Sequence, residues 1–281
     1  MAQGRSIHVG LNAVDPDGYD GWDGQLVACE FDAKDMAALA SAKGFSAQTL
    51  LTKEATSTAI LRAIEDAAAE MDEGDILFLT YSGHGGQVPD SNSDEDDRMD
   101  ETWCAYDRQV VDDELYSAWS AFPAGARILV LSDSCHSGTA IKAVLGAVRP
   151  ETLGEAVGHG EPTSEQRMRA MPADVGRRTY EKHKAAYDEI QANVRAFDES
   201  PLEASVLLIS GCQDNQTSAD GDRNGLFTQT LLQVWDDGKF RGSYKTFAKG
   251  IVGKMPPWQA PNLFGAGAPN PGFEGEQPFT I

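Results

Sequence analysis

The chain has 281 residues, with 44 acidic and 23 basic side chains and a net charge of −21. Such an excess of negative charge disfavours nucleic acid and anionic lipid as partners and suits a cationic substrate. No apolar run approaches the roughly 18 residues that a membrane-spanning helix needs, and no signal-peptide pattern precedes the first predicted strand. These features predict a cytoplasmic protein that binds neither nucleic acid nor membrane.

The length suits a single domain over residues 1–281, and short apolar runs alternate with helical patterns along it. This alternation predicts right-handed crossovers and a mostly parallel sheet. Residues 146–201 have a lower apolar density and are predicted to be an insertion that holds one polar helix over 178–197. Strands are predicted at 7–11, 47–52, 75–81, 128–131, 205–211 and, at an edge, 277–281, with helices at 32–44, from 57 onward, at 112–122 and in two segments beyond 226.

Two of these strands end in small polar residues that include a histidine and a cysteine. The run 75–81 opens into Ser-Gly-His-Gly-Gly, with His84 at its centre, and the run 128–131 leads to Cys135. If the strands are parallel neighbours, the thiol and the imidazole meet at one sheet edge, where a histidine can activate a cysteine nucleophile. The backbone N–H groups of Gly85 and Cys135 would then form the oxyanion hole. His136 is a rival imidazole, but its position next to Cys135 directs it away, and no third residue that would fix the His84 ring is evident.

The four cysteines are widely spaced and contain no C-x-x-C pair, which disfavours a structural zinc site or a redox dithiol. The default expectation for any one of them is a small buried hydrophobic residue. The strand-end position is what separates Cys135 from Cys29, Cys104 and Cys212.

The segments 81–87 and 133–139 resemble the two signature motifs of the metacaspases, the caspase-like cysteine peptidases of bacteria, plants, fungi and protists. Further similarity lies at 28–32, at 209–220 and at the pair Asp112-Asp113, so that it covers most of 5–145 and 203–236. The 51 positions between His84 and Cys135 also match the spacing of about 50 known for caspases. The resemblance implies a standalone bacterial catalytic domain with a caspase-like fold, a three-layer α/β sandwich whose six-stranded, mostly parallel sheet lies between helices. It also implies a cysteine endopeptidase that cleaves after Arg or Lys through a thioester, with Cys135 as nucleophile and His84 as acid and base.

The same resemblance places Cys29, Asp32, Ser82 and Asp133 in the pocket for the basic side chain of the substrate. Asp133 precedes Cys135 by two positions, so it shares the strand face and the same opening. Two carboxylates can hold a guanidinium by charge-assisted bonds. Alternatively, Asp32 caps the following helix and Asp133 accepts backbone N–H bonds.

Residues 90–101 contain seven acidic side chains in twelve positions. An EF-hand template fails here, because Glu95 replaces the required glycine and no helix pair flanks the loop. The resemblance instead implies a calcium site at Asp100, Asp112 and Asp113, with calcium as an activator and no cofactor required for the chemistry. Lys142 stands at a fourth ligand position and weakens this inference, and a solvated acidic loop is the alternative.

Basic residues are frequent within the predicted insertion, which makes it a candidate for self-cleavage by a peptidase that cuts after Arg or Lys. An ordinary exposed helix is the alternative.

The expected partners are a protein or peptide substrate with Arg or Lys before the cleaved bond and a separate activator. Two rival functions stay open: a ligand-gated or calcium-gated signalling module with little turnover, and a related hydrolase with another residue preference. The basic residues of the predicted insertion that could be cut are Arg149, Arg167, Arg169, Arg177, Arg178, Lys182 and Lys184.

Overall fold

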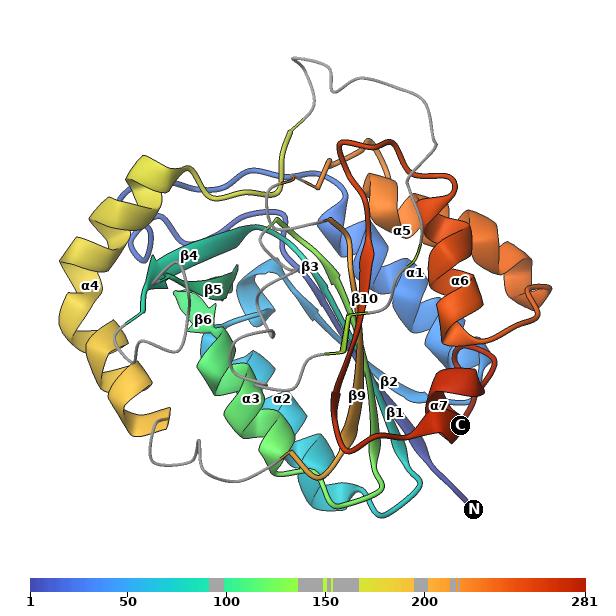
Figure 1. Cartoon of the computed structure of the whole chain (residues 1–281). Helices are drawn as coiled ribbons and strands as arrows, with labels where there is room; N and C mark the ends of the chain where they lie inside the picture. Colours follow the sequence, from blue (N-terminus) through green and yellow to red (C-terminus); the bar gives the residue numbers. More distant parts are fainter. Residues whose placement is uncertain are drawn as a thin grey trace.

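A central sheet with helices on both faces forms the body of the protein (Figure 1). The computed structural model describes residues 1–90, 99–135, 149–150, 153, 167–194, 202–212, 216 and 218–281. The sheet has the strand order β2-β1-β3-β7-β9-β10-β8, in which the first five strands are parallel and β10 and β8 are antiparallel to their neighbours. The bounds are β2 Ser46–Leu51, β1 Gly4–Gly10, β3 Ile76–Ser82, β7 Arg127–Asp133, β9 Ser205–Ser210, β10 Asn262–Gly267 and β8 Arg149–Pro150.

The predicted six-stranded, mostly parallel sheet between helices is confirmed, with the two-residue β8 as an addition at one edge. Strand residues alternate between two hydrophobic cores, as the pleat of a sheet requires. Leu77, Leu79, Ile128 and Val130 face one core, which α2 and α3 complete. The intervening residues of the same strands face a second core against α1, α5 and α6. Because both faces are covered, the central strands read as continuous apolar runs.

The helices lie in two groups around the sheet, with α1, α5, α6 and α7 to the right and α2 and α3 to the left in Figure 1. The Thr56 side chain caps α2 by accepting a 3.2 Å hydrogen bond from the N–H of Ala59. The bounds are α1 Cys29–Ala42, α2 Ser57–Glu70, α3 Asp112–Ser120, α4 Ala173–Val194, α5 Leu226–Trp235, α6 Tyr244–Val252 and α7 Pro271–Gly275.

A second sheet of three antiparallel strands was not predicted. It consists of β4 Gly85–Pro89, β5 Met99–Cys104 and β6 Gln109–Val111, and α4 lies beside it (Figure 1). The acidic residues around 90–101 conceal the strand pattern of β5, whose side chains are mostly buried. The polar helix predicted over 178–197 is present as α4 but begins earlier.

The prediction that residues 277–281 pair as an edge strand is wrong. The strand β10 pairs with β9 instead, and the tail packs against the sheet through Phe279, which is fully buried. Its ring centroid lies 5.0 Å from that of Phe78 in β3. Within the described part of the chain, no helix combines the length and the apolar character needed to cross a bilayer.

Candidate active site

The strands β3 and β7 bring His84 and Cys135 to the same edge of the main sheet. The two strands are parallel neighbours, with Ser82 opposite Asp133 at their carboxyl ends. His84 and Cys135 each follow by two residues, and both are buried. The geometry therefore joins two residues that are 51 positions apart in the sequence, as the strand-end pattern predicted. The rival imidazole of His136 lies outside the described residues.

Gly85 allows the chain after β3 to touch the chain after β7. A Cβ atom at this position would lie 1.8 Å from the carbonyl oxygen of Cys135, so that any side chain would force the two segments apart. The absence of a side chain thus brings the backbone N–H of Gly85 beside that of Cys135.

The ring of His84 is fixed by a backbone carbonyl group that the sequence analysis did not identify. Its Nε2 lies 3.0 Å from the carbonyl oxygen of Gly24, and since a carbonyl only accepts, Nε2 carries the proton. Nδ1 is buried and has no hydrogen-bond partner, which leaves its lone pair available in the neutral ring. The Trp22 ring packs against the imidazole at a centroid distance of 4.7 Å. Burial lowers the pKa of His84 to about 4, although the backbone of Gly24 and of Ala170 acts in the opposite direction, so the ring is neutral near pH 7.

The sulfur of Cys135 is held by a backbone donor. The N–H of Ser218 donates a 3.0 Å hydrogen bond to Sγ. A donor at this position stabilises negative charge on sulfur, and the thiolate is the reactive form of cysteine. Ser218 lies before Ala219 in the segment that follows β9, so that a third part of the chain completes the surroundings of the thiol.

Beside the thiol lies a pocket of carboxylates that encloses the side chain of Arg169, which is fully buried. The Arg169 guanidinium lies 2.7 Å from Asp32, 2.8 Å from Asp133 and 3.0 Å from Asp220. It also donates a 2.9 Å hydrogen bond to the hydroxyl of Ser82. Three of the four residues predicted for a basic-side-chain pocket are therefore brought together around a guanidinium that belongs to the chain itself.

The backbone at the rim of this pocket must come close to the guanidinium. At Gly225, the residue before α5, a Cβ atom would lie 2.5 Å from a terminal nitrogen of Arg169. The N–H of Gly225 also donates a 3.1 Å hydrogen bond to Asp32. Asp32 makes no capping bond to its own helix α1, so the alternative of a helix cap does not describe its contacts.

Asp133 and Asp32 also accept hydrogen bonds from the fold around them. Asp133 accepts one from the Thr228 hydroxyl at 3.1 Å and one from the Ser218 hydroxyl. Burial raises the pKa of Asp32 to about 6, with Arg169 opposing this effect and the neighbouring Asp133 adding to it. Burial of the charged carboxylates therefore costs free energy, and the guanidinium offsets this cost.

Cys29, the fourth predicted pocket residue, plays a different part. It is fully buried at the start of α1, and burial raises the pKa of its thiol well above the usual range. The Cys29 thiol is therefore neutral. It lines the pocket next to Ser82 and makes no ion pair. Asp220, by contrast, was missed, although it ends the 209–220 motif, because several acidic residues stand in the same polar loop.

The main chain of Arg169 also contacts the predicted oxyanion donors. Its carbonyl oxygen accepts hydrogen bonds from the N–H of Gly85 at 3.0 Å and from the N–H of Cys135 at 3.1 Å. These lengths are those expected of donors that stabilise an oxyanion. The arrangement can bind a peptide with a basic side chain in the pocket and polarise the carbonyl group that follows it.

The calcium ligands implied by the resemblance do not form a set within the described residues. Asp100 lies in β5 and accepts a 2.7 Å hydrogen bond from Gln191, while Asp112 and Asp113 begin α3. No group of three or more His, Cys, Asp or Glu side chains in the described part of the chain is placed to hold one metal ion. Lys142 lies outside the described residues. The calcium site stays a prediction.

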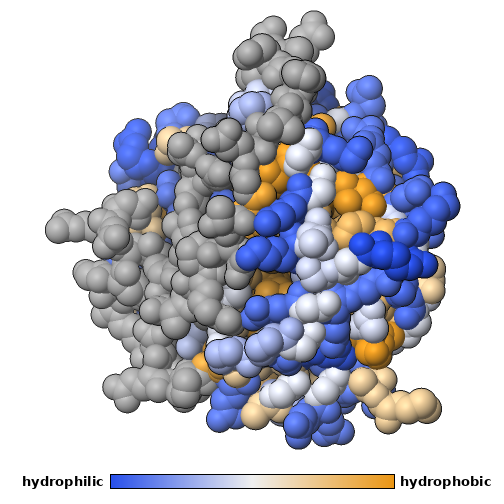
Figure 2. Space-filling model, turned by 45° about the vertical axis from the view of Figure 1, so that its right-hand side comes forward, coloured by the Kyte–Doolittle hydropathy of each residue, from blue (hydrophilic) through white to orange (hydrophobic). Residues whose placement is uncertain are grey.

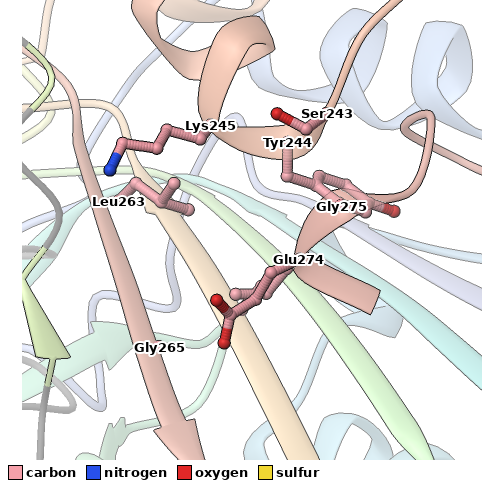
Figure 3. A pocket seen from close by; sticks show the side chains of 8 residues that line it. Ser243, Tyr244, Lys245, Leu263, Gly265, Glu274 and Gly275 are labelled. Atoms are coloured by element: carbon pink, nitrogen blue, oxygen red, sulfur yellow. The ribbon is translucent and has the colours of Figure 1, made fainter. Parts of the chain in front are cut away.

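Another cavity of the described chain contains neither His84 nor Cys135. It lies between α6, α7 and β10, where Tyr244, Lys245 and Glu274 surround it together with apolar residues (Figure 3). On the face shown in Figure 2, the described residues are mostly hydrophilic and the hydrophobic ones form small separate patches. His84 and Cys135 lie instead at the carboxyl ends of β3 and β7, where open α/β sheets usually bind their ligands.

Comparison with known proteins agrees with this geometry. A family model described as the caspase domain matches residues 14–269. The chain belongs to the caspase-domain family, and the relatives that it matches include metacaspases. This match and the structural similarity given below confirm the implied family and fold. The caspase-domain family is one of cysteine-type peptidases.

Two fungal relatives of this caspase domain are Metacaspase-1 of Coccidioides immitis and Metacaspase-1A of Aspergillus terreus. They are each 32% identical to it, over 249 and 253 residues, which is 81% of this chain in both cases. The match covers 52% and 60% of those proteins, so the chain spans little more than half of their length. The crystal structure of protein GSU0716 from Geobacter sulfurreducens has a TM-score of 0.84 and 48% identity, and the match covers 99% of each chain.

Proposed function

We propose that this caspase domain is a cysteine endopeptidase that hydrolyses peptide bonds after Arg or Lys, with Cys135 as nucleophile and His84 as acid and base. The observation that carries the proposal is the placement of Arg169. Its guanidinium is enclosed by Asp32, Asp133 and Asp220, while its carbonyl oxygen lies on the N–H groups of Gly85 and Cys135. A basic side chain and the carbonyl group to be attacked are thus recognised together.

The expected reaction is acyl transfer through a thioester. Nδ1 of His84 accepts the proton of the Cys135 thiol, and the sulfur attacks the carbonyl carbon after the basic residue. The developing oxyanion is stabilised by the N–H groups of Gly85 and Cys135. His84 then gives the proton to the leaving amine as the C–N bond breaks, and water hydrolyses the thioester to release the acid and the free thiol.

The pocket favours Arg over Lys. The guanidinium nitrogens of Arg169 contact four different residues, namely Ser82 and the three aspartates. A lysine ammonium is a single point and cannot reach acceptors spread over a planar fork. We therefore expect Lys to be accepted with a lower kcat/KM, and Asp, which would add a fourth carboxylate, to be rejected.

A peptide-library cleavage profile of the wild type and of Cys135→Ala tests the proposal. We expect cleavage after Arg and, more slowly, after Lys in the wild type, and none in the variant. Cys104→Ala, which removes another buried thiol, serves as the matched control and retains cleavage. A wild type that prefers another residue would support a related hydrolase of different preference.

A rival reading is a ligand-gated or calcium-gated signalling module with little turnover. Labelling with an Arg-chloromethylketone distinguishes the two, since it requires both the pocket and a reactive thiol. Modification of Cys135 agrees with the peptidase, whereas an unmodified thiol in protein that shows no cleavage, with and without added calcium, supports the signalling module.

We also propose that the protein acts in the cytoplasm on protein or peptide substrates and responds to a separate activator. All four cysteines are free thiols, which suits a reducing compartment. Fractionation followed by measurement of Arg-directed cleavage in each fraction checks the location.

A further inference from the structure

We propose that Gln259 is a positioning residue for the proposed peptidase, and that it acts by holding Ser218 against the thiol of Cys135 and against the backbone of the basic residue in the pocket. The inference rests on the proposed function and adds to it a residue from a distant part of the chain. It is carried by the hydrogen bonds of one fully buried amide group.

Gln259 lies in the loop between α6 and β10, and its amide contacts the segment that follows β9. The amide oxygen accepts a 3.0 Å hydrogen bond from the N–H of Ala219. The amide nitrogen donates to the carbonyl of Gly211 at 3.2 Å and to the hydroxyl of Ser218 at 2.8 Å. A single side chain therefore joins the two ends of the segment between Gly211 and Ala219.

The partners of this amide decide which of its two ends is the oxygen. A backbone N–H only donates and a backbone carbonyl only accepts, so the oxygen faces Ala219 and the nitrogen faces Gly211. The nitrogen therefore donates to Ser218, whose hydroxyl accepts this bond. The proton of that hydroxyl is then directed at the carboxylate of Asp133, which accepts it. Gln259 thus sets the direction of a hydrogen bond that ends in the pocket.

Ser218 contacts three parts of the site through three different groups. Its N–H donates to the sulfur of Cys135 at 3.0 Å, where it stabilises negative charge. Its carbonyl accepts a 2.9 Å hydrogen bond from the N–H of Arg169, whose side chain fills the pocket. Its hydroxyl donates to Asp133. The position of Ser218 therefore affects the thiol and the binding of a basic residue together.

The loop that carries Gln259 is itself fixed on both sides of this residue. The side chain of Gln216 donates to the carbonyl of Pro257 at 2.8 Å and accepts from the N–H of Ala260 at 2.6 Å. The N–H of Gln259 donates to the carbonyl of Pro256 at 3.0 Å. The amide is therefore held in place before a substrate binds, as a supporting residue of a precise site must be.

Loss of the amide would remove a partner from three buried polar groups at once, on Gly211, Ser218 and Ala219. A buried polar group that loses its partner is costly, so the backbone around it shifts to recover a hydrogen bond. The contacts of Ser218 tolerate little of this, because a displacement of about 1 Å in a catalytic site can cost about 100-fold in rate.

Alkylation of Cys135 by iodoacetamide, located by peptide mass spectrometry over a wide pH range, tests the inference without any peptide substrate. Gln259→Met keeps the size of the side chain and removes its hydrogen bonds. We expect the midpoint of the pH profile to move up by about one pH unit, because the donor to the thiolate is misplaced. An unchanged midpoint would overturn the inference.

Gln109→Met is the matched control for this measurement. Gln109 is also fully buried, but it lies in β6 and its side chain accepts a 2.7 Å hydrogen bond from the hydroxyl of Thr102. We expect the alkylation midpoint of the wild type in this variant. A midpoint that moves equally in both variants would attribute the effect to the loss of any buried amide and would contradict the positioning role.

Ser218→Ala tests the route from Gln259 to the thiol, and it also decides the case if Gln259→Met does not fold. We expect a raised alkylation midpoint in Ser218→Ala, and in the double variant a rise clearly smaller than the sum of the two single effects, since contacting residues do not act additively. A wild-type midpoint in Ser218→Ala, or fully additive effects, would contradict the route.

Steady-state kinetics on an Arg fluorogenic peptide separate this inference from the proposed function. Because Ser218 contacts both the thiol and the backbone of the basic residue, Gln259→Met should lower kcat and raise KM, with kcat/KM reduced by about 10- to 100-fold. A wild type that cleaves the peptide, with a variant of equal kinetics, would overturn the inference alone. A raised midpoint in a protein that cleaves no Arg peptide would support the positioning role and contradict the proposed peptidase.

Discussion

The carboxylate of Asp220 lies 3.0 Å from the guanidinium of Arg169, which makes it a third acid around a single buried cation. It also accepts hydrogen bonds from the N–H groups of Val27 and Ala28, at 2.7 Å and 3.2 Å, so that the loop before α1 fixes its position. The pocket is thus assembled from four separate parts of the chain. A cation that enters it contacts all of them at once.

Asp220→Asn should lower kcat/KM for an Arg peptide by about 10- to 100-fold, because a hydrogen bond to a charged group contributes about 1.5–3 kcal/mol. The amide keeps the shape and one acceptor oxygen, so we expect the loss to fall mainly on KM. Steady-state kinetics measure it, with the exposed Asp222→Asn as the control. A variant with unchanged kinetics would remove Asp220 from the pocket.

The pH dependence of Arg-peptide cleavage should have an acid limb near pH 6. Burial raises the pKa of Asp32 to about 6 when a guanidinium occupies the pocket, so the carboxylate loses its charge as the pH falls through that value and cation binding weakens. His84, whose pKa burial lowers to about 4, stays neutral over the same range. A pH series of kcat/KM measures the limb. Asp32→Asn should lack it, and its persistence in that variant would assign it to another group.

The raised pKa of Asp32 also affects the stability of the fold, but in the opposite direction: a falling pH weakens cation binding and strengthens the fold. Because the folded-state pKa of Asp32 lies above its unfolded value of 3.8, this group alone makes the fold more stable as the pH falls from about 6 towards 3.8. Urea unfolding of the wild type and of Asp32→Asn over this range should show a difference in stability that changes with pH. A constant difference would contradict the raised pKa.

Gly24→Ala should lower kcat by about 10- to 100-fold, since small displacements of a catalytic group are costly. Gly24 has a φ of +53°, and a Cβ atom there would lie 3.1 Å from the His84 ring. Gly21→Ala is the matched control, because Gly21 also has a positive φ, of +88°, but a Cβ atom there has no neighbour within 4 Å. Both variants carry backbone strain, and only the first should move the imidazole. Equal losses of kcat would attribute the effect to strain alone.

Much of the site follows from where two apolar runs end. His84 and Cys135 stand directly after strands, and parallel neighbours must bring such residues to one edge. Gly24 could not be found in this way, because it contributes a carbonyl group that every residue possesses. Arg169 was one basic residue among several, and only the fold shows which of them is buried. The strand β5 was missed because acidic residues masked its short alternation, and β4 and β6 have only five and three residues.

The contact between Gly85 and Cys135 has a consequence for how this domain could be altered. Each supplies one N–H to the same oxygen, and there is no room between their backbones for even a methyl group. The two donors must therefore move together. Engineering that shifts one loop to admit a bulkier substrate will carry the other loop with it, so substrate scope is more readily tuned at the carboxylates than at this pair.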